Sequence, residues 1–155
     1  MTRIASVFLA ALLLASAAFA AKPLATVSTN WDGIELDLMS VERKGSVLTV
    51  KWAVRNTGAE AVKPAFTMVG DGSSTYLVDE ENGTKYYALT DKEGHILATM
   101  HEYIGSNRSG IAESIEPGTT KRYWAKFPAP PPAVKSISVF FTNTEPIEEV
   151  AITDK

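Results

Sequence analysis

Residues 46–56, with the sequence S-V-L-T-V-K-W-A-V-R-N, carry the clearest alternation of apolar and polar side chains in the chain. The side chains of one parity are Leu48, Val50, Trp52 and Val54, and those of the other are Thr49, Lys51, Ala53 and Arg55. Successive side chains of a β-strand point to opposite faces, so this period of two predicts a strand that buries one face. We expect a central strand here, with Trp52 in the core.

The same alternation, interrupted by turn residues, continues through the chain from Ile34 onward. It predicts further strands at residues 34–39, 66–69, 76–78, 85–89, 95–100, 119–127, 136–141 and 147–153. Asn82-Gly83 is a hairpin signal because both residues tolerate positive φ, and we expect a loop at 107–110. No segment after the first twenty residues has the periodicity of an amphipathic helix.

About eight or nine short strands separated by turns predict an antiparallel β-sandwich of immunoglobulin type over residues 34–155. A β-barrel is the alternative. We interpret residues 21–33 as a lead-in segment or an edge strand. Proline lacks the backbone donor of a central strand, so the proline-rich residues 128–132 predict a stiff connection, with a docking ligand as the less favoured interpretation.

Residues Met1–Ala20 have the parts of a secretory signal peptide. Arg3 supplies a positive charge, an apolar run follows, and Ala18-Phe19-Ala20 matches the cleavage pattern. We therefore expect cleavage between Ala20 and Ala21 and export of the remaining chain. An uncleaved membrane anchor is the alternative, because residues 4–21 form 18 uncharged positions, near the lower limit for a membrane-spanning helix.

Removal of the first 20 residues from 155 leaves 135, enough for one domain. Arg3 is the one charged residue removed, so the 15 basic residues become 14 against 18 acidic ones, a net charge of −4. This balance argues against a nucleic-acid partner, which needs a clustered basic surface. The chain has no cysteine, which excludes disulfides, cysteine-based metal sites and a lipid anchor on an N-terminal cysteine.

The order of turns and strand ends resembles that of a known family. The matching segments are Gly45–Val50, Asn56-Thr57-Gly58, Tyr76–Asp79 with Asn82-Gly83 and Tyr86, Ile115–Thr119, Phe127-Pro128 and Pro146-Ile147. Across Leu36–Ile152 they resemble the telokin-like, immunoglobulin-fold domains of bacterial exported proteins, most of which lack an assigned function. The resemblance implies the sandwich fold and a periplasmic or secreted location, and it supplies no catalytic residues.

The sequence contains no recognisable catalytic constellation. A nucleophile needs a neighbouring base, and the two histidines, His95 and His101, would lie about 20 Å apart on one straight strand. Gly-x-Ser-x-Gly, His-Glu-x-x-His and phosphate-loop motifs do not occur. We therefore expect a protein that is not an enzyme and uses no cofactor.

Two hypotheses of metal binding are weaker than the hypothesis of a binding module without a metal. Copper would need soft ligands, and the available ones are Met39, Met68, Met100 and His101. Calcium would need oxygen ligands, which Asp79-Glu80-Glu81, Asp71 and Asp91 could supply from neighbouring turns. Scattered methionines usually fill cores, and acidic turns are usually solvated, so we expect no metal site.

Four aromatic residues suggest an interaction surface. Trp124 and Phe140 are out of phase with the apolar parity of their strands, Tyr87 is the out-of-phase member of Tyr86-Tyr87, and Trp31 precedes the first clear strand. Exposed aromatic side chains on a sheet can stack on sugar rings or anchor a protein interface. Alternatively, Trp124 and Phe140 pack under a loop or against each other across the sheet.

These observations together predict an exported, non-enzymatic module that binds a protein or a cell-envelope component, without stable membrane insertion after cleavage. The alternative is a periplasmic carrier of a small molecule or of a metal, copper or calcium.

Overall fold

The fold is an all-β sandwich, in agreement with the alternating sequence pattern. The computed structural model describes residues 22–69, 74–99, 102–105 and 108–155, so the expected signal peptide and its Ala20–Ala21 cleavage site lie outside the described residues. Within the described ranges there are twelve strands and no helix. All pairings among these described strands are antiparallel except one, that of β12 (Thr153–Asp154) with β2 (Ile34–Lys44).

The first sheet is built on the predicted central strand. Its order is β1 (Ala25–Ser28), β2 (Ile34–Lys44), β3 (Val47–Asn56) and β9 (Thr120–Pro128). The short strand β12 (Thr153–Asp154) pairs in parallel with β2, on the same edge that β1 occupies further along. Residues 21–33 therefore do contain an edge strand, β1.

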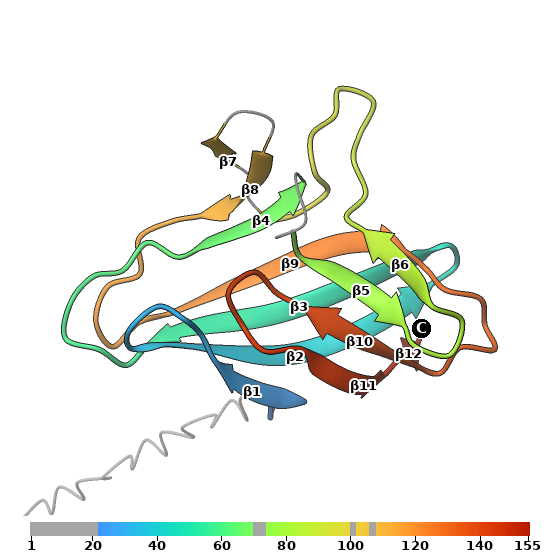
Figure 1. Ribbon diagram of the computed structural model, residues 1–155, viewed down its shortest axis with the longest axis horizontal. Coiled ribbons are helices and arrows are strands. Elements are labelled where there is room, and N and C mark those ends of the chain that lie inside the picture. Colours follow the sequence, from blue (N-terminus) through green and yellow to red (C-terminus); the bar gives the residue numbers. More distant parts are fainter. Residues whose placement is uncertain (1–21, 70–73, 100–101, 106–107) are drawn as a thin grey trace, which may run out of the picture.

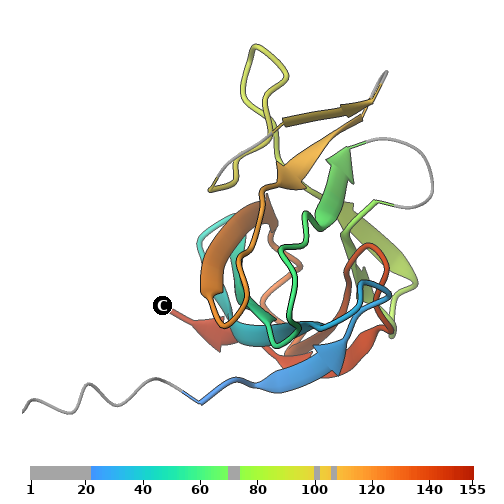
Figure 2. The same ribbon diagram turned by 90° about the vertical axis from the view of Figure 1, so that its left-hand side faces the viewer.

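The second sheet covers the first. Its order is β11 (Ile147–Ala151), β10 (Ser136–Phe140), β5 (Tyr76–Asp79) and β6 (Thr84–Tyr87). In Figure 1 these strands lie in front of β2 and β3, and the end view in Figure 2 shows the two layers enclosing the interior. A third, smaller sheet has the order β4 (Ala65–Val69), β8 (Arg108–Ala112) and β7 (Glu102–Gly105).

Two strand predictions and one loop prediction differ from the structure. Residues 95–99 form no strand; with residues 89–91 they make a projecting hairpin with isolated bridges, one of them from Ala98 to Ala125 of β9. The expected loop at 107–110 gives way to β8 from Arg108. The predicted strand 147–153 divides, because Ile152 bonds to the Lys135 carbonyl beside β10 whereas Thr153 pairs with β2.

The core lies between the two main sheets and is closed by β4. Its centre is an aromatic cluster around Trp52, which is 1 % exposed. The ring centroids of Phe141, Tyr123 and Phe66 lie 5.1, 5.8 and 6.3 Å from that of Trp52. Trp52 therefore occupies the core as predicted, although its indole nitrogen has no hydrogen-bond partner among the described residues.

A bulge at Met39 changes which residues of β2 face the core. The ladder between β2 and β3 shifts register between Leu38 and Ser40, so one extra residue enters β2. Before the bulge, even-numbered residues such as Leu38 are buried; after it, Val41 and Arg43 are buried instead. The bulge thus turns the side chain of Arg43 inward.

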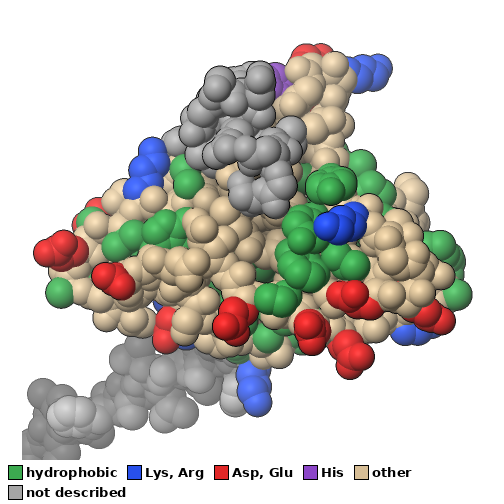
Figure 3. Space-filling view, in the orientation of Figure 1, with side chains coloured by type: hydrophobic (Ala, Val, Ile, Leu, Met, Phe, Trp, Pro, Cys, Tyr) green, Lys and Arg blue, Asp and Glu red, His purple; other side chains and the backbone are tan. Residues whose placement is uncertain are grey.

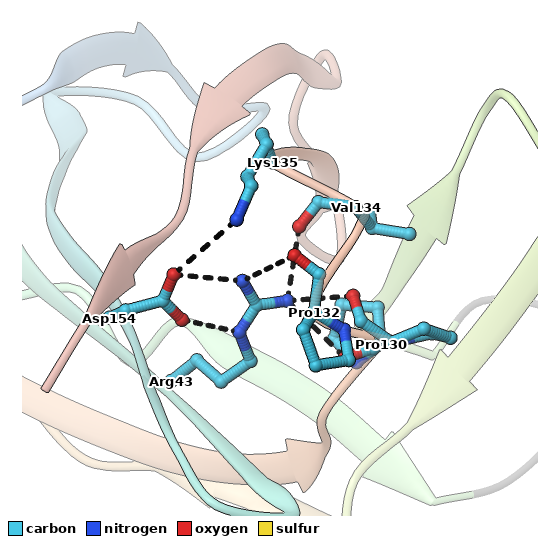
Figure 4. Close-up of polar contacts among 7 residues, drawn as sticks. Arg43, Pro130, Pro132, Val134, Lys135 and Asp154 are labelled. Carbon is cyan, nitrogen blue, oxygen red and sulfur yellow. Dashed lines mark hydrogen bonds and ion pairs between the residues drawn. The ribbon is translucent and has the colours of Figure 1, made fainter.

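Arg43 joins β2 to the proline-rich connection and to β12 (Figure 4). Its guanidinium donates hydrogen bonds to the carbonyls of Pro131 and Val134 at 2.9 and 3.0 Å, and longer ones to those of Pro130 and Pro132. Its Nε also pairs with Asp154 at 2.6 Å. The stiff connection predicted at 128–132 is thus held by one buried cation.

A second charged group lies on the outer face of β2. Asp37 accepts hydrogen bonds from Thr26 of β1 and from Nε of Arg55 at 2.7 Å. Burial alone would raise the pKa of Asp37, but these hydrogen bonds and the charge of Arg55 together hold it below its ordinary value of 3.8. The ionised carboxyl of Asp37 therefore stabilises the fold.

We expect Asp37→Asn to flatten the acid dependence of stability. Because the folded-state pKa is depressed, the stabilisation is present above the ordinary pKa of 3.8 that Asp37 has in the unfolded chain, and it is lost as the pH falls through the folded value. The free energy of unfolding, measured in urea at pH 7, 4 and 3, should fall less for Asp37→Asn than for the natural protein. The exposed Glu148→Gln is the control, and equal slopes for all three proteins would contradict the role of Asp37.

Candidate binding surface

The structure does not bring the four predicted aromatic residues together. Trp31 is half-buried, and its ring packs edge-on against Phe66 of the core with 5.3 Å between centroids. A turn at Gly33, with φ of +70°, returns the chain to β2 beside Gly58, where an added Cβ would lie 2.7 Å from backbone atoms. Trp31 therefore packs at the end of the sandwich, apart from the other three aromatic residues, and its role in an interaction surface stays a prediction.

Tyr87 and Phe140 lie in one row on the outer face of the second sheet, with Tyr76 between them. Register places Tyr76 opposite Phe140 and opposite Tyr87. The Tyr76 and Phe140 rings are 4.8 Å apart and inclined by 9°, and those of Tyr76 and Tyr87 are 6.0 Å apart. The ammonium of Lys85 lies 4.5 Å from the Tyr76 ring centre. Figure 3 shows hydrophobic side chains gathered over β5, β6 and β10.

The aromatic side chains of this row mainly contact one another. Parallel rings only 4.8 Å apart must face each other, so Phe140 and Tyr76 stand on the sheet and present their edges to solvent. The aromatic edge offers C–H groups rather than a flat surface for stacking. Tyr87, which is 55 % exposed, is the member with an open ring. Phe140 therefore packs across the sheet, although against Tyr76 rather than against Trp124.

Trp124 lies on the outer face of the other sheet. Its neighbours Tyr123 and Ala125 are buried, whereas Trp124 is 36 % exposed. Arg122 and Lys126 share its parity and flank it along β9, and the Lys126 ammonium lies 5.7 Å from the Trp124 ring centre. Sequence analysis missed these two cations, although their alternation with the buried residues was visible.

The hairpin of residues 89–99 holds this part of β9 in place. The main-chain nitrogen of Trp124 donates to Thr99 Oγ1 at 2.7 Å, and the Thr99 nitrogen donates to the Trp124 carbonyl at 3.0 Å. The main-chain nitrogen of Lys126 donates to the Leu97 carbonyl at 2.9 Å, and its carbonyl accepts from the Leu89 nitrogen at 2.8 Å. Because β3 pairs with the other edge, the backbone under Trp124 and Lys126 is bonded on both sides.

A hollow of about 230 Å³ opens beside Trp124. Its lining consists of Met39, Lys51, Trp52, Arg122, Tyr123 and Trp124. The hollow spans three strands. The bulge places Met39 of β2 in it, and Lys51 of β3 pairs with Trp124 of β9. Burial, followed by the hydrogen bond that the Tyr123 hydroxyl donates to Glu113, raises the pKa of Tyr123, so this phenol stays neutral.

Among the described residues, those considered as copper or calcium ligands serve other roles. Met68 is buried in the core, Met39 lines the outer hollow, and Met100 and His101 lie outside the described residues, as does Asp71. Asp79 is buried and accepts hydrogen bonds from the main chain and the side chain of Asn82, so it caps the β5–β6 turn. This turn borders a polar hollow of about 390 Å³ that reaches Ser138 and Glu149.

One group in the described ranges has the composition of a metal site. The ligand atoms of Asp91, Glu93 and His95 lie within 4.8 Å of one another at the exposed tip of the hairpin. The Asp91 carboxylate already accepts hydrogen bonds from the Glu93 and His95 nitrogens, and this bonding, foremost that from the His95 main chain, lowers its pKa. These hydrogen bonds within the hairpin tip explain why the three side chains lie close together, without a bound metal ion.

Comparison with family models, curated proteins and solved structures finds no match to this chain. The resemblance to telokin-like domains therefore stays a prediction. No helix in the part of the chain that the structure describes is long and apolar enough to cross a membrane.

Proposed function

We propose that this chain is an exported, non-enzymatic binding module that engages a protein or cell-envelope component through the outer face of β9 around Trp124. The observation that carries the proposal is the exposed Trp124 beside an apolar hollow, on backbone that is hydrogen-bonded at both edges. Tryptophan is enriched among the residues that dominate binding energies, and a pre-ordered surface loses little entropy on binding. The signal-peptide pattern of Met1–Ala20 supports the exported location.

Trp124 supports the proposal better than the aromatic row does. Trp124 borders the apolar hollow, whereas Phe140 and Lys85 contact Tyr76 of the row. An interface needs surface that becomes buried only on binding, and the hollow supplies such surface.

Trp124→Ala should reduce partner capture at least tenfold. The purified protein, tagged and cross-linked to an envelope extract, would be compared with Trp124→Ala and with Tyr87→Ala. Tyr87 is the matched control, because it is an exposed aromatic residue outside the proposed surface. We expect Tyr87→Ala to capture the same partners as the natural protein, in the same amounts by quantitative mass spectrometry.

The reverse outcome would exclude this surface. Unchanged capture by Trp124→Ala, with near-ultraviolet circular dichroism showing a native fold, would mean that Trp124 takes no part in binding. If Tyr87→Ala alone loses partner capture, the aromatic row of the second sheet is the binding surface.

A further inference from the structure

On the outer face of the first sheet, some charged side chains form ion pairs and others do not. On β2 the acidic residues are paired: Arg55 of β3 contacts Glu35 at 2.8 Å and Asp37 at 2.7 Å, and Lys51 contacts Glu42 at 3.0 Å. On β9, neither Arg122 nor Lys126 has an acidic partner within 4.0 Å among the described residues. The unbalanced charge of this face is therefore positive and lies on both sides of Trp124.

The position of these cations favours an anionic partner. Arg122 and Lys126 are two residues from Trp124 in opposite directions, about 7 Å along the strand in each case. Oppositely charged groups on a partner would gain attraction without breaking an existing ion pair of the protein. A guanidinium presents paired N–H donors that match the two oxygens of a carboxylate.

The hollow indicates what the partner carries beside its carboxylates. Its volume of about 230 Å³ is below that of common small-molecule pockets, about 300–1,000 Å³, and suits a single side chain. Its lining includes Met39 and Trp124. A sugar ring would place hydroxyl groups against this apolar lining, where each one without a hydrogen-bond partner costs free energy. An aliphatic or aromatic side chain has no such cost.

We infer that the surface around Trp124 binds an acidic peptide segment of another protein, with an apolar side chain of that segment in the hollow and neighbouring carboxylates on Arg122 and Lys126. The inference rests on the proposed function and adds the chemistry of the partner. The net charge of −4 expected for the exported chain makes this basic site a local exception, so that acidic segments are steered to it rather than to the rest of the surface.

The test uses a displayed library of random dodecapeptides selected on the purified natural protein. We expect the enriched peptides to carry Asp or Glu next to an aliphatic or aromatic residue. The most enriched peptide, labelled with fluorescein, should bind by fluorescence polarisation, and its affinity should fall as salt is raised. Arg122→Glu/Lys126→Glu should weaken its binding at least tenfold. Lys85→Glu, a charge reversal on the other sheet, is the matched control and should have little effect.

Several outcomes would overturn the inference. Enrichment of neutral or basic peptides, absence of enrichment, or equal binding to Arg122→Glu/Lys126→Glu would each exclude an acidic peptide. Polygalacturonate and phosphatidylglycerol vesicles are tested in parallel. Binding of either one that requires Arg122 and Lys126, without peptide enrichment, would replace the peptide by an anionic glycan or lipid. That result would overturn the acidic-peptide inference but leave the proposed function intact. The proposed function itself fails only if Trp124→Ala still captures all envelope partners.

Discussion

Trp52→Ala is expected to lower the free energy of unfolding by about 3–5 kcal/mol, the range for removing a large aromatic residue from a core. Trp52 is 1 % exposed and packs against Phe66 of β4, Tyr123 of β9 and Phe141, the residue after β10. The cavity would therefore open where several elements of the sandwich meet, and no single element can move to fill it. Urea unfolding followed by far-ultraviolet circular dichroism measures the loss.

Two further variants separate packing from other effects. Trp124→Ala removes the same side chain from a position that is 36 % exposed, so its stability should fall less than that of Trp52→Ala. Trp52→Phe should cost less than Trp52→Ala, because it keeps an aromatic ring and removes an indole nitrogen that has no described partner. A loss for Trp124→Ala as large as that for Trp52→Ala would contradict the assignment of the core to Trp52.

Arg43→Met should destabilise the protein by about 2–4 kcal/mol. The variant leaves the buried carbonyls of Pro130 and Val134 without the donor that now bonds to them at 3.3 and 3.0 Å, and each buried acceptor left unpaired costs about 1–3 kcal/mol. Arg43→Lys should recover part of the loss, since one ammonium cannot reach all the acceptors that the planar guanidinium serves. The measurement is the same urea titration.

Asp154→Asn is the control for the ion pair. The Asp154 side chain is 57 % exposed, whereas that of Arg43 is 5 % exposed, so solvent screens the attraction on the Asp154 side. We therefore expect Asp154→Asn to cost much less than Arg43→Met. Equal losses would show that the ion pair, rather than the bonds to the proline-rich connection, provides the stabilisation.

Strands whose side chains alternate strictly could be predicted from the sequence. In residues 46–56 each apolar side chain of the predicted parity is buried, and the structure confirms β3 and the core position of Trp52. Which side chains of β2 face the core could be predicted only as far as Leu38. The extra residue at Met39 has no turn signal in the sequence, and it reverses the parity that buries Arg43.

The candidate surface was predicted in part. Alternation correctly placed Trp124 on an outer face, because that depends only on neighbouring residues. It could not tell that Phe140 and Trp124 lie on different sheets, since pairing between strands far apart in sequence is decided by tertiary packing. Trp31 lies in a loop without periodicity, so its packing against Phe66 left no local signal.

The pairing of β12 with β2 also bears on the rates of folding and unfolding. Arg43 and Asp154 are 111 residues apart, whereas β2 and β3 are joined by a tight turn at Gly45. Closing so long a loop is entropically costly, so the β2–β3 hairpin can form early and the β12 contacts late. Contacts absent from the folding transition state slow unfolding without speeding folding. We therefore expect the contacts of β12 with β2 to prolong the lifetime of the folded protein.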